Sequence, residues 1–84
     1  MINFYKVKDT EIRRAVEVNK DGQRAEVKAI IGKVSELLEK EIIFQDNTFG
    51  NEEKWLVICK DGVDIMEFDS LQDAKDSCIE RWTK

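Results

Sequence analysis

The chain has 84 residues, of which 42% are hydrophobic and 38% are charged, and it contains no histidine. This length suits a single domain, 1–84, with a thin core. The lack of histidine removes the commonest general base and the commonest transition-metal ligand. No apolar run is long enough to cross a membrane, and the N-terminus lacks the layout of a signal peptide, so we expect a cytoplasmic protein.

The charge is divided unevenly along the chain, which carries −4 overall. Residues 1–40 contain nine Lys/Arg and seven Asp/Glu, a balance of +2, whereas residues 41–84 contain five Lys/Arg and eleven Asp/Glu, a balance of −6. An acidic surface repels phosphate backbones and attracts basic surfaces. The second half therefore suggests contact with a basic protein surface, although a charged face that only interacts with solvent gives the same pattern.

The first part of the chain predicts two strands. Alternating apolar residues indicate a strand over Ile2–Lys8. The next stretch, Glu11–Val18, fits either a strand or a short helix. We favour the strand, because Val16 and Val18 alternate around a glutamate and polar loop residues follow them.

Helical spacing predicts a long helix over Gln23–Glu41, with one wide apolar stripe formed by Val27, Ile30, Ile31, Val34, Leu37 and Leu38. The opposite face of this helix carries Ala25, Ala29 and Gly32, at spacings of four and three. Small residues in a row let another element approach closely, so these three are a candidate interface with a partner, a second copy or the terminal helix. The alternative is that alanine is simply a good helix former and the glycine is tolerated.

A short strand is predicted over Glu41–Gln45, and a hairpin follows it. Asp61-Gly62 separates two apolar runs and favours a type I′ turn, which needs a positive φ at both central positions. Placing the turn there fixes the register of the hairpin. It sets Trp55 opposite Phe68, Leu56 opposite Glu67, Val57 opposite Met66, Ile58 opposite Ile65 and Cys59 opposite Asp64.

The last element reads as a capped helix. Ser70 and Asp73 have the spacing of a capping box, in which the serine hydroxyl accepts a hydrogen bond from a free backbone N–H. The apolar residues that follow at helical spacing are Leu71, Ala74, Cys78 and Trp82, with Ile79 beside them. This stripe should lie on the sheet.

Together these elements predict an α+β fold in the order ββαβββα, in which an antiparallel sheet packs against two helices. The second element is the one that fits a helix as an alternative. The expected core consists of Phe4, Val27, Ile30, Ile31, Val34, Leu38, Trp55, Val57, Met66, Phe68, Leu71, Cys78 and Trp82.

The sequence contains no recognisable catalytic motif. Cys59 and Cys78 occupy core-facing positions and read as buried thiols, with a disulfide between them as the alternative. Neither has a general base nearby in the sequence, no glycine-rich phosphate loop appears, and no spacing of ligands suggests a metal site. We therefore expect a protein that is not an enzyme and needs neither a cofactor nor a metal.

Two sets of charged residues could bind a partner. The acidic set surrounds the hairpin and the terminal helix, and consists of Asp64, Glu67, Asp69, Asp73 and Asp76. It predicts a protein partner with a basic surface. The basic set consists of Arg13, Arg14, Arg24 and Lys28 and would suit a small nucleic-acid-binding or regulatory domain. Acidic residues interrupt the basic set and the chain is acidic overall, so direct nucleic-acid binding is disfavoured. A structural homodimer through Ala25, Ala29 and Gly32 is a third hypothesis.

The C-terminal pattern resembles a unit of small phage and mobile-element proteins, in which a hairpin leads into a capped helix. The matching residues are Trp55, Val57, Asp61-Gly62, Phe68, Ser70-Leu71 and Ala74-Lys75. A similar arrangement occurs in the arm-type DNA-binding domains of phage integrases. Here, however, the outward positions hold Leu56, Ile58 and Glu67 instead of basic residues, which does not support DNA reading.

A small, acidic, histidine-free αβ protein also resembles phage inhibitors of the anti-CRISPR type. That resemblance implies a phage-encoded protein in the host cytoplasm that blocks the basic, nucleic-acid-binding surface of a host defence protein.

Overall fold

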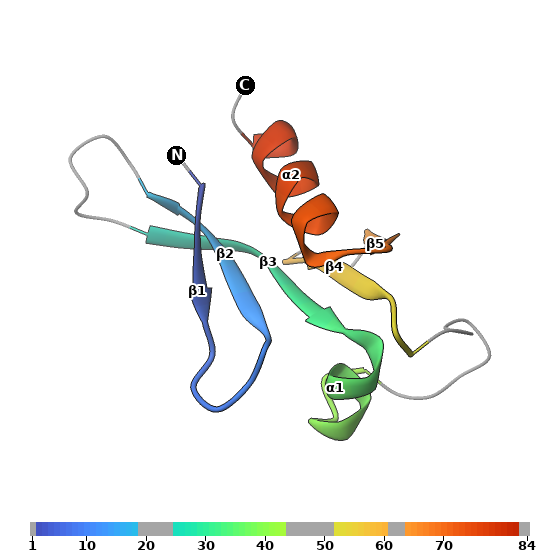
Figure 1. Ribbon diagram of the computed structural model, residues 1–84. Coiled ribbons are helices and arrows are strands. Elements are labelled where there is room, and N and C mark those ends of the chain that lie inside the picture. The colour runs from blue at the N-terminus through green and yellow to red at the C-terminus, as the bar shows by residue number, and fades with distance from the viewer. Residues whose placement is uncertain (1, 19–24, 44–51, 61–63, 83–84) are drawn as a thin grey trace.

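The computed structural model describes residues 2–18, 25–43, 52–60 and 64–82. They form one antiparallel sheet of five strands with two helices (Figure 1). The sheet order β1-β2-β3-β4-β5 follows the chain, so each strand pairs with its neighbour in the sequence. The predicted α+β class is thereby confirmed. The elements are β1 (Ile2–Lys6), β2 (Arg13–Val18), β3 (Ala25–Lys33), α1 (Val34–Glu39), β4 (Trp55–Cys59), β5 (Ile65–Phe68) and α2 (Leu71–Trp82).

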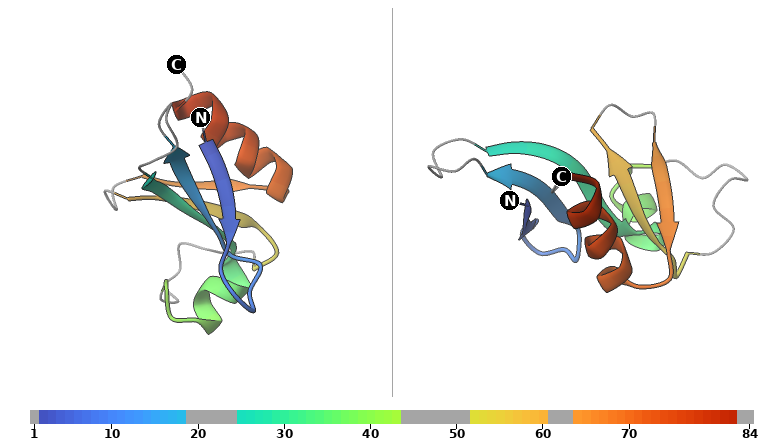
Figure 2. Two further views of the ribbon diagram at one scale, coloured as in Figure 1. Left: turned by 90° about the vertical axis from the view of Figure 1, so that its left-hand side faces the viewer. Right: turned by 90° about the horizontal axis from the view of Figure 1, so that it is seen from above.

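The two helices lie on opposite faces of the sheet. We call these the α2 face and the α1 face. On the α2 face, one apolar cluster joins α2 to the sheet and contains the buried residues Ile2, Ala15, Ala29, Ile31, Val57, Ala74 and Cys78. On the α1 face, a second cluster contains Ile12, Val34, Leu37, Ile43 and Leu56. Figure 2 shows α2 running across the sheet, whereas α1 lies beyond the end of β3. Most of the α1 face therefore has no helix over it.

The hairpin and the last helix form as predicted. The register of β4 and β5 is the expected one, including Trp55 opposite Phe68 and Ile58 opposite Ile65. The turn at Asp61-Gly62 lies outside the described residues. At the start of α2, the backbone N–H of Asp73 donates to Oγ of Ser70 over 3.1 Å, as the capping box requires. Local sequence chemistry is therefore enough to place residues 55–60 and 64–82.

The predicted helix over Gln23–Glu41 is wrong for most of its length. Residues 25–33 form β3, and only Val34–Glu39 is helical. The favoured strand in the preceding stretch is confirmed as β2, and β3 pairs with it. The pairing of β2 with β3 gives the reason for the error. Ala15 lies opposite Ala29, but the next residue, Val16, lies opposite Val27, so the pairing skips Lys28.

This irregularity is a β-bulge, in which one strand carries an extra residue. Arg14 and Val16 share one face of β2, and their partners Ile30 and Val27 therefore share that face as well. Two residues of one face are thus three apart along β3, which is a helical spacing and not the spacing of a regular strand. Val27, which we expected in the core, is 37% exposed.

The strand predicted over Glu41–Gln45 is also wrong where the structure describes it. Residues 41–43 form a turn and a bend after α1. The N–H groups of Ile42 and Ile43 donate back to the carbonyl of Leu37, over 2.9 and 3.3 Å. Ile43 is buried in the cluster with Leu37, so its hydrophobicity serves to close α1 and not to build a strand. Residues 44 and 45 lie outside the described residues.

The small residues expected on a helix surface lie on β3 instead. Ala29 is buried beneath α2 in the larger cluster. Gly32 is buried as well, and a Cβ atom built on it would lie 2.9 Å from Cδ2 of Leu37 and 3.2 Å from Cγ1 of Ile12. The side chain of Ala25 lies outside the description. The predicted helix face formed by Ala25, Ala29 and Gly32 is therefore wrong, because the three residues lie on a strand. Ala29 does pack against the terminal helix, which is one of the partners named above, whereas Gly32 packs against α1 on the other face.

The end of α1 gives a testable prediction. Glu41 follows the last turn of α1 with φ of 60°, in the left-handed region that favours glycine. Glu41→Gly should raise the free energy of unfolding by about 1 kcal/mol, measured by urea denaturation, because the left-handed conformation costs glycine little. Glu39→Gly is the matched control and should lower it by up to about 1 kcal/mol, because it places glycine at the last helical residue of α1. A loss of stability in Glu41→Gly would contradict the assignment.

Candidate functional site

Acidic side chains form a stripe along one flank of α2. Asp73, Asp76 and Glu80 follow each other at spacings of three and four, which places them on the same side of the helix. α2 forms there because Ser70 caps its start and its apolar residues pack on the sheet. The stripe is thus held on a rigid element, beside β5.

This stripe is one wall of a broad, shallow surface hollow of about 550 Å³. We call it the acidic hollow. Its charged lining comprises five acids and one lysine, a formal charge of −4, and it also includes Phe68 and Ser77. The charged residues are Lys54, Glu67, Asp69, Asp73, Asp76 and Glu80.

Four of the five acids predicted for partner binding meet in the acidic hollow. They are Glu67 and Asp69 from the end of β5, and Asp73 and Asp76 from α2. Asp64 does not line it, because its carboxylate accepts a hydrogen bond from Nη2 of Arg81 at 2.7 Å. Glu80 was missing from the predicted set. The spacing of three and four that connects Asp73, Asp76 and Glu80 would have identified it.

Few of these acids have cationic partners. Lys54 forms an ion pair with Asp69. Oδ1 of Asp76 accepts a hydrogen bond from Gln72 Nε2 at 2.9 Å, which restrains the carboxylate but does not neutralise it. Phe68, which also lines the hollow, packs against the cluster beneath α2 and so connects the hollow to the core. The hollow therefore keeps most of its negative charge for a partner.

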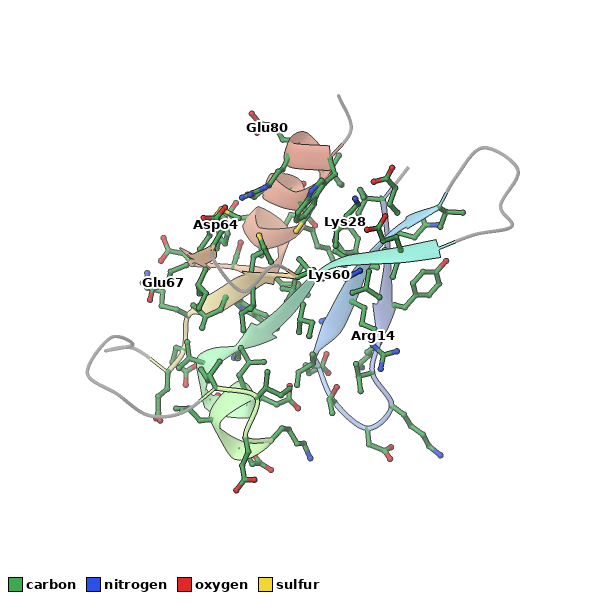
Figure 3. All side chains as sticks on the ribbon, turned by 180° about the vertical axis from the view of Figure 1, so that it is seen from behind. Arg14, Lys28, Lys60, Asp64, Glu67 and Glu80 are labelled. Carbon is green, nitrogen blue, oxygen red and sulfur yellow. The ribbon has the colours of Figure 1, made fainter. Side chains whose placement is uncertain are left out.

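Among the described residues of the rival basic set, Arg13 and Lys28 are paired with carboxylates. Nη2 of Arg13 lies 3.4 Å from Oε2 of Glu11. Lys28 is shared between Glu17 and Glu26, each at 3.5 Å. Arg24 lies outside the described residues. Figure 3 shows Arg14 far from Asp64, Glu67 and Glu80, which gather near β5 and α2. Carboxylates thus neutralise much of the positive charge that nucleic acid would need.

The two cysteines are buried and are not linked to each other. Burial above all, and the neighbouring Cys59 in addition, raise the pKa of the Cys78 thiol to about 11, although Arg81 lowers it. A thiol with this pKa is protonated at neutral pH and is a poor nucleophile. Within the described ranges, no group of three His, Cys, Asp or Glu side chains could hold a metal ion.

Comparison with protein-family models, curated proteins and solved structures finds no match for the chain. Neither helix in the described part of the chain is long and apolar enough to span a membrane.

Proposed function

We propose that this protein is a non-enzymatic binding module whose acidic hollow docks on a basic surface of a partner protein. The observation that carries the proposal is the gathering of five acids, from β5 and from one flank of α2, around a hollow that contains a single lysine. A basic surface would gain charge-assisted contacts with Asp76 and Glu80, and Phe68 in the lining offers an apolar contact.

The spacing of these charges favours a surface that otherwise holds nucleic acid. Asp73 and Glu80 are seven positions apart, which is roughly 10 Å along the helix, so with Asp76 they provide about three charges per 10 Å. One strand of DNA carries a phosphate every 3.4 Å, which is also about three charges per 10 Å. The α2 stripe therefore matches the charge density of one strand, and an inhibitor that occludes such a groove would need a stripe of this kind.

The resemblance to phage inhibitors of the anti-CRISPR type suggests which partners to test first. They are nucleic-acid-directed host defence enzymes with a basic groove. In this mechanism the acidic stripe of α2 occupies the groove and blocks it without covalent chemistry. One molecule of the inhibitor blocks one groove. Binding should weaken as salt concentration rises, because the contacts are between exposed charges.

Charge reversal within the stripe is the experiment. Asp76→Lys/Glu80→Lys should weaken binding to a partner enzyme by roughly a hundredfold, about tenfold for each reversed contact, in a titration calorimeter. Both positions lie beyond the first turn of α2, so the capping box is unaffected.

The matched control is Glu39→Lys/Glu52→Lys, which makes the same change in net charge at exposed positions outside the acidic hollow. It should retain most of the affinity. Equal losses in the two variants would mean that net charge alone matters, and unchanged binding in the first would refute the site.

A further inference from the structure

A groove opens on the α1 face of the sheet, where the loop after β1 meets the turn after α1. Its volume is about 270 Å³, and three separate segments of the chain form its walls. The lining residues are Val7, Thr10, Ile12, Arg14, Ile30, Lys40 and Ile42. Four of these are aliphatic, and the two that carry charge are both cations. We call this feature the aliphatic groove.

The aliphatic walls of this groove are fixed to the rest of the fold. Ile12 is 3% exposed and belongs to the same buried cluster as Leu37. Val7 and Ile30 pack against that cluster. On the opposite wall, the backbone N–H of Ile42 donates to the carbonyl of Leu37 over 2.9 Å, which ties Ile42 back to α1. The groove is therefore formed before any ligand enters it.

The polar groups of the walls already have partners within the chain. Five lining residues lie outside the strands, and the backbone N–H of each donates to another group of the chain. They are Val7, Thr10, Ile12, Lys40 and Ile42. The hydroxyl of Thr10 donates to the carbonyl of Val7 over 2.9 Å and accepts from the N–H of Ile12 over 3.1 Å. These walls have few hydrogen bonds left for the amides of a peptide, so they favour a hydrocarbon chain.

The two cations are the groups that select the charge of the ligand. Arg14 comes from β2 and Lys40 from the turn after α1, so they reach the groove from two different segments. Both are exposed, and neither forms an ion pair with a carboxylate in the described part of the chain. Positive charge beside an aliphatic wall complements an acyl chain that ends in a carboxylate.

The volume of the groove limits the length of that chain. It is slightly below the roughly 300–1,000 Å³ of sites that hold drug-sized molecules. A water molecule takes up about 30 Å³ of the liquid, and a methylene group is of similar size, so the groove holds up to about nine such groups. A single unbranched chain fits this space better than a larger lipid does.

We propose that the aliphatic groove binds a medium-chain fatty acid as its free carboxylate. The chain lies against Ile12, Ile30 and Ile42, and the carboxylate accepts hydrogen bonds from Arg14 and Lys40. Binding is reversible and involves no covalent step.

This site is independent of the proposed function. The aliphatic groove adjoins the cluster on the α1 face, whereas the acidic stripe belongs to α2, which packs on the opposite face. Figure 3 shows Arg14 well apart from Glu67 and Glu80 of the acidic hollow. Asp76→Lys/Glu80→Lys should therefore bind octanoate as the wild-type chain does, so that failure of one proposal is distinguishable from failure of the other.

Calorimetric titration with fatty acids of increasing length tests the groove. From butanoate to octanoate, the affinity should rise roughly two- to fourfold for each added methylene, because each one leaves water for an aliphatic wall. 1-Octanol, which has the same chain without the carboxylate, should bind roughly tenfold more weakly than octanoate.

Removal of the two cations tests the recognition of charge. Arg14→Gln/Lys40→Gln should weaken octanoate binding by roughly tenfold, a modest factor because both cations are exposed, and should leave 1-octanol binding unchanged. The matched control is Lys6→Gln/Lys60→Gln, which makes the same change in net charge at exposed lysines outside the groove. It should keep the wild-type affinity.

A carboxylate placed on the wall tests the position of the chain. Ile42→Asp should abolish binding of both octanoate and 1-octanol, whereas Ile79→Asp, on α2 and equally exposed at 42%, should bind both normally. Circular dichroism melts verify that each variant is folded. The proposal would be overturned by a wild-type chain that shows no saturable octanoate binding, by equal affinities for octanoate and 1-octanol, or by equal losses in a variant and its control.

Discussion

Leu37→Ala should lower the free energy of unfolding by about 3 kcal/mol, which is a large share of the roughly 4–13 kcal/mol expected for a domain of this size. α1 has only six residues, and an isolated helix of that length is unstable in water. It persists because Val34 and Leu37 are completely buried against Ile12 and Leu56. Removing the leucine leaves a cavity and takes away the main anchor of α1.

Leu38→Ala is the matched control. Leu38 is the next residue of the same helix and is only partly buried beside the same cluster. Its truncation should cost about 1 kcal/mol, because less apolar surface returns to water and no enclosed cavity forms. Urea denaturation of the two variants measures the difference. Equal losses would show that α1 is not anchored by one face, contrary to the packing in the structure.

Gly32→Val should destabilise the fold by about 2–3 kcal/mol, although valine is a better strand former than glycine. The first added carbon would already lie 2.9 Å from Cδ2 of Leu37 and 3.2 Å from Cγ1 of Ile12. Both neighbours are buried, so neither can move into solvent. Their displacement would push α1 away from the sheet.

A double-mutant cycle identifies the source of this loss. Leu37→Ala removes the nearest obstacle, so Gly32→Val in that background should cost much less than it does alone. Thermal or urea unfolding of the four proteins gives the coupling energy. Strict additivity would mean that the contact with Leu37 is not what makes glycine necessary.

The sequence predicted the hairpin of β4 and β5 because its signals are local. A two-residue turn with apolar runs on both sides determines every pair from Trp55–Phe68 to Ile58–Ile65. The capping box at Ser70 is equally local, and the structure shows its hydrogen bond. Where neighbouring residues decide the conformation, one sequence is enough.

β3 could not be found in this way, because the β-bulge and the burial of both faces hide its alternation. The β-bulge opposite Ala15 and Val16 places Val27 and Ile30 on one face with a helical spacing. Further along, Ala29 and Ile31 pack beneath α2, whereas Gly32 packs beneath α1. A strand covered on both faces reads as a continuous apolar run, which a helix also gives. The conformation of β3 is therefore determined by residues that are distant in the sequence.

Only part of the acidic hollow was predicted, because the rest also depends on residues that are far apart in the sequence. The composition of the last half pointed to its acids, and helix spacing connects Asp73 with Asp76. The separation of Asp64 depends on Arg81, which approaches it from the other end of α2. The residues that share each face of the sheet depend on the pairing of all five strands, so they could not be identified while β3 was taken for a helix.

The position of α2 has a consequence for synthesis of the chain. The residues that cover Ile2 and Phe4 come from the last described element, since Ala74 and Cys78 belong to the same cluster. β1 leaves the ribosome before α2, so it stays uncovered on that face until residue 78 has emerged. This sheet therefore cannot complete its folding strand by strand from β1, and the nascent chain exposes an apolar sheet face until α2 has been synthesised.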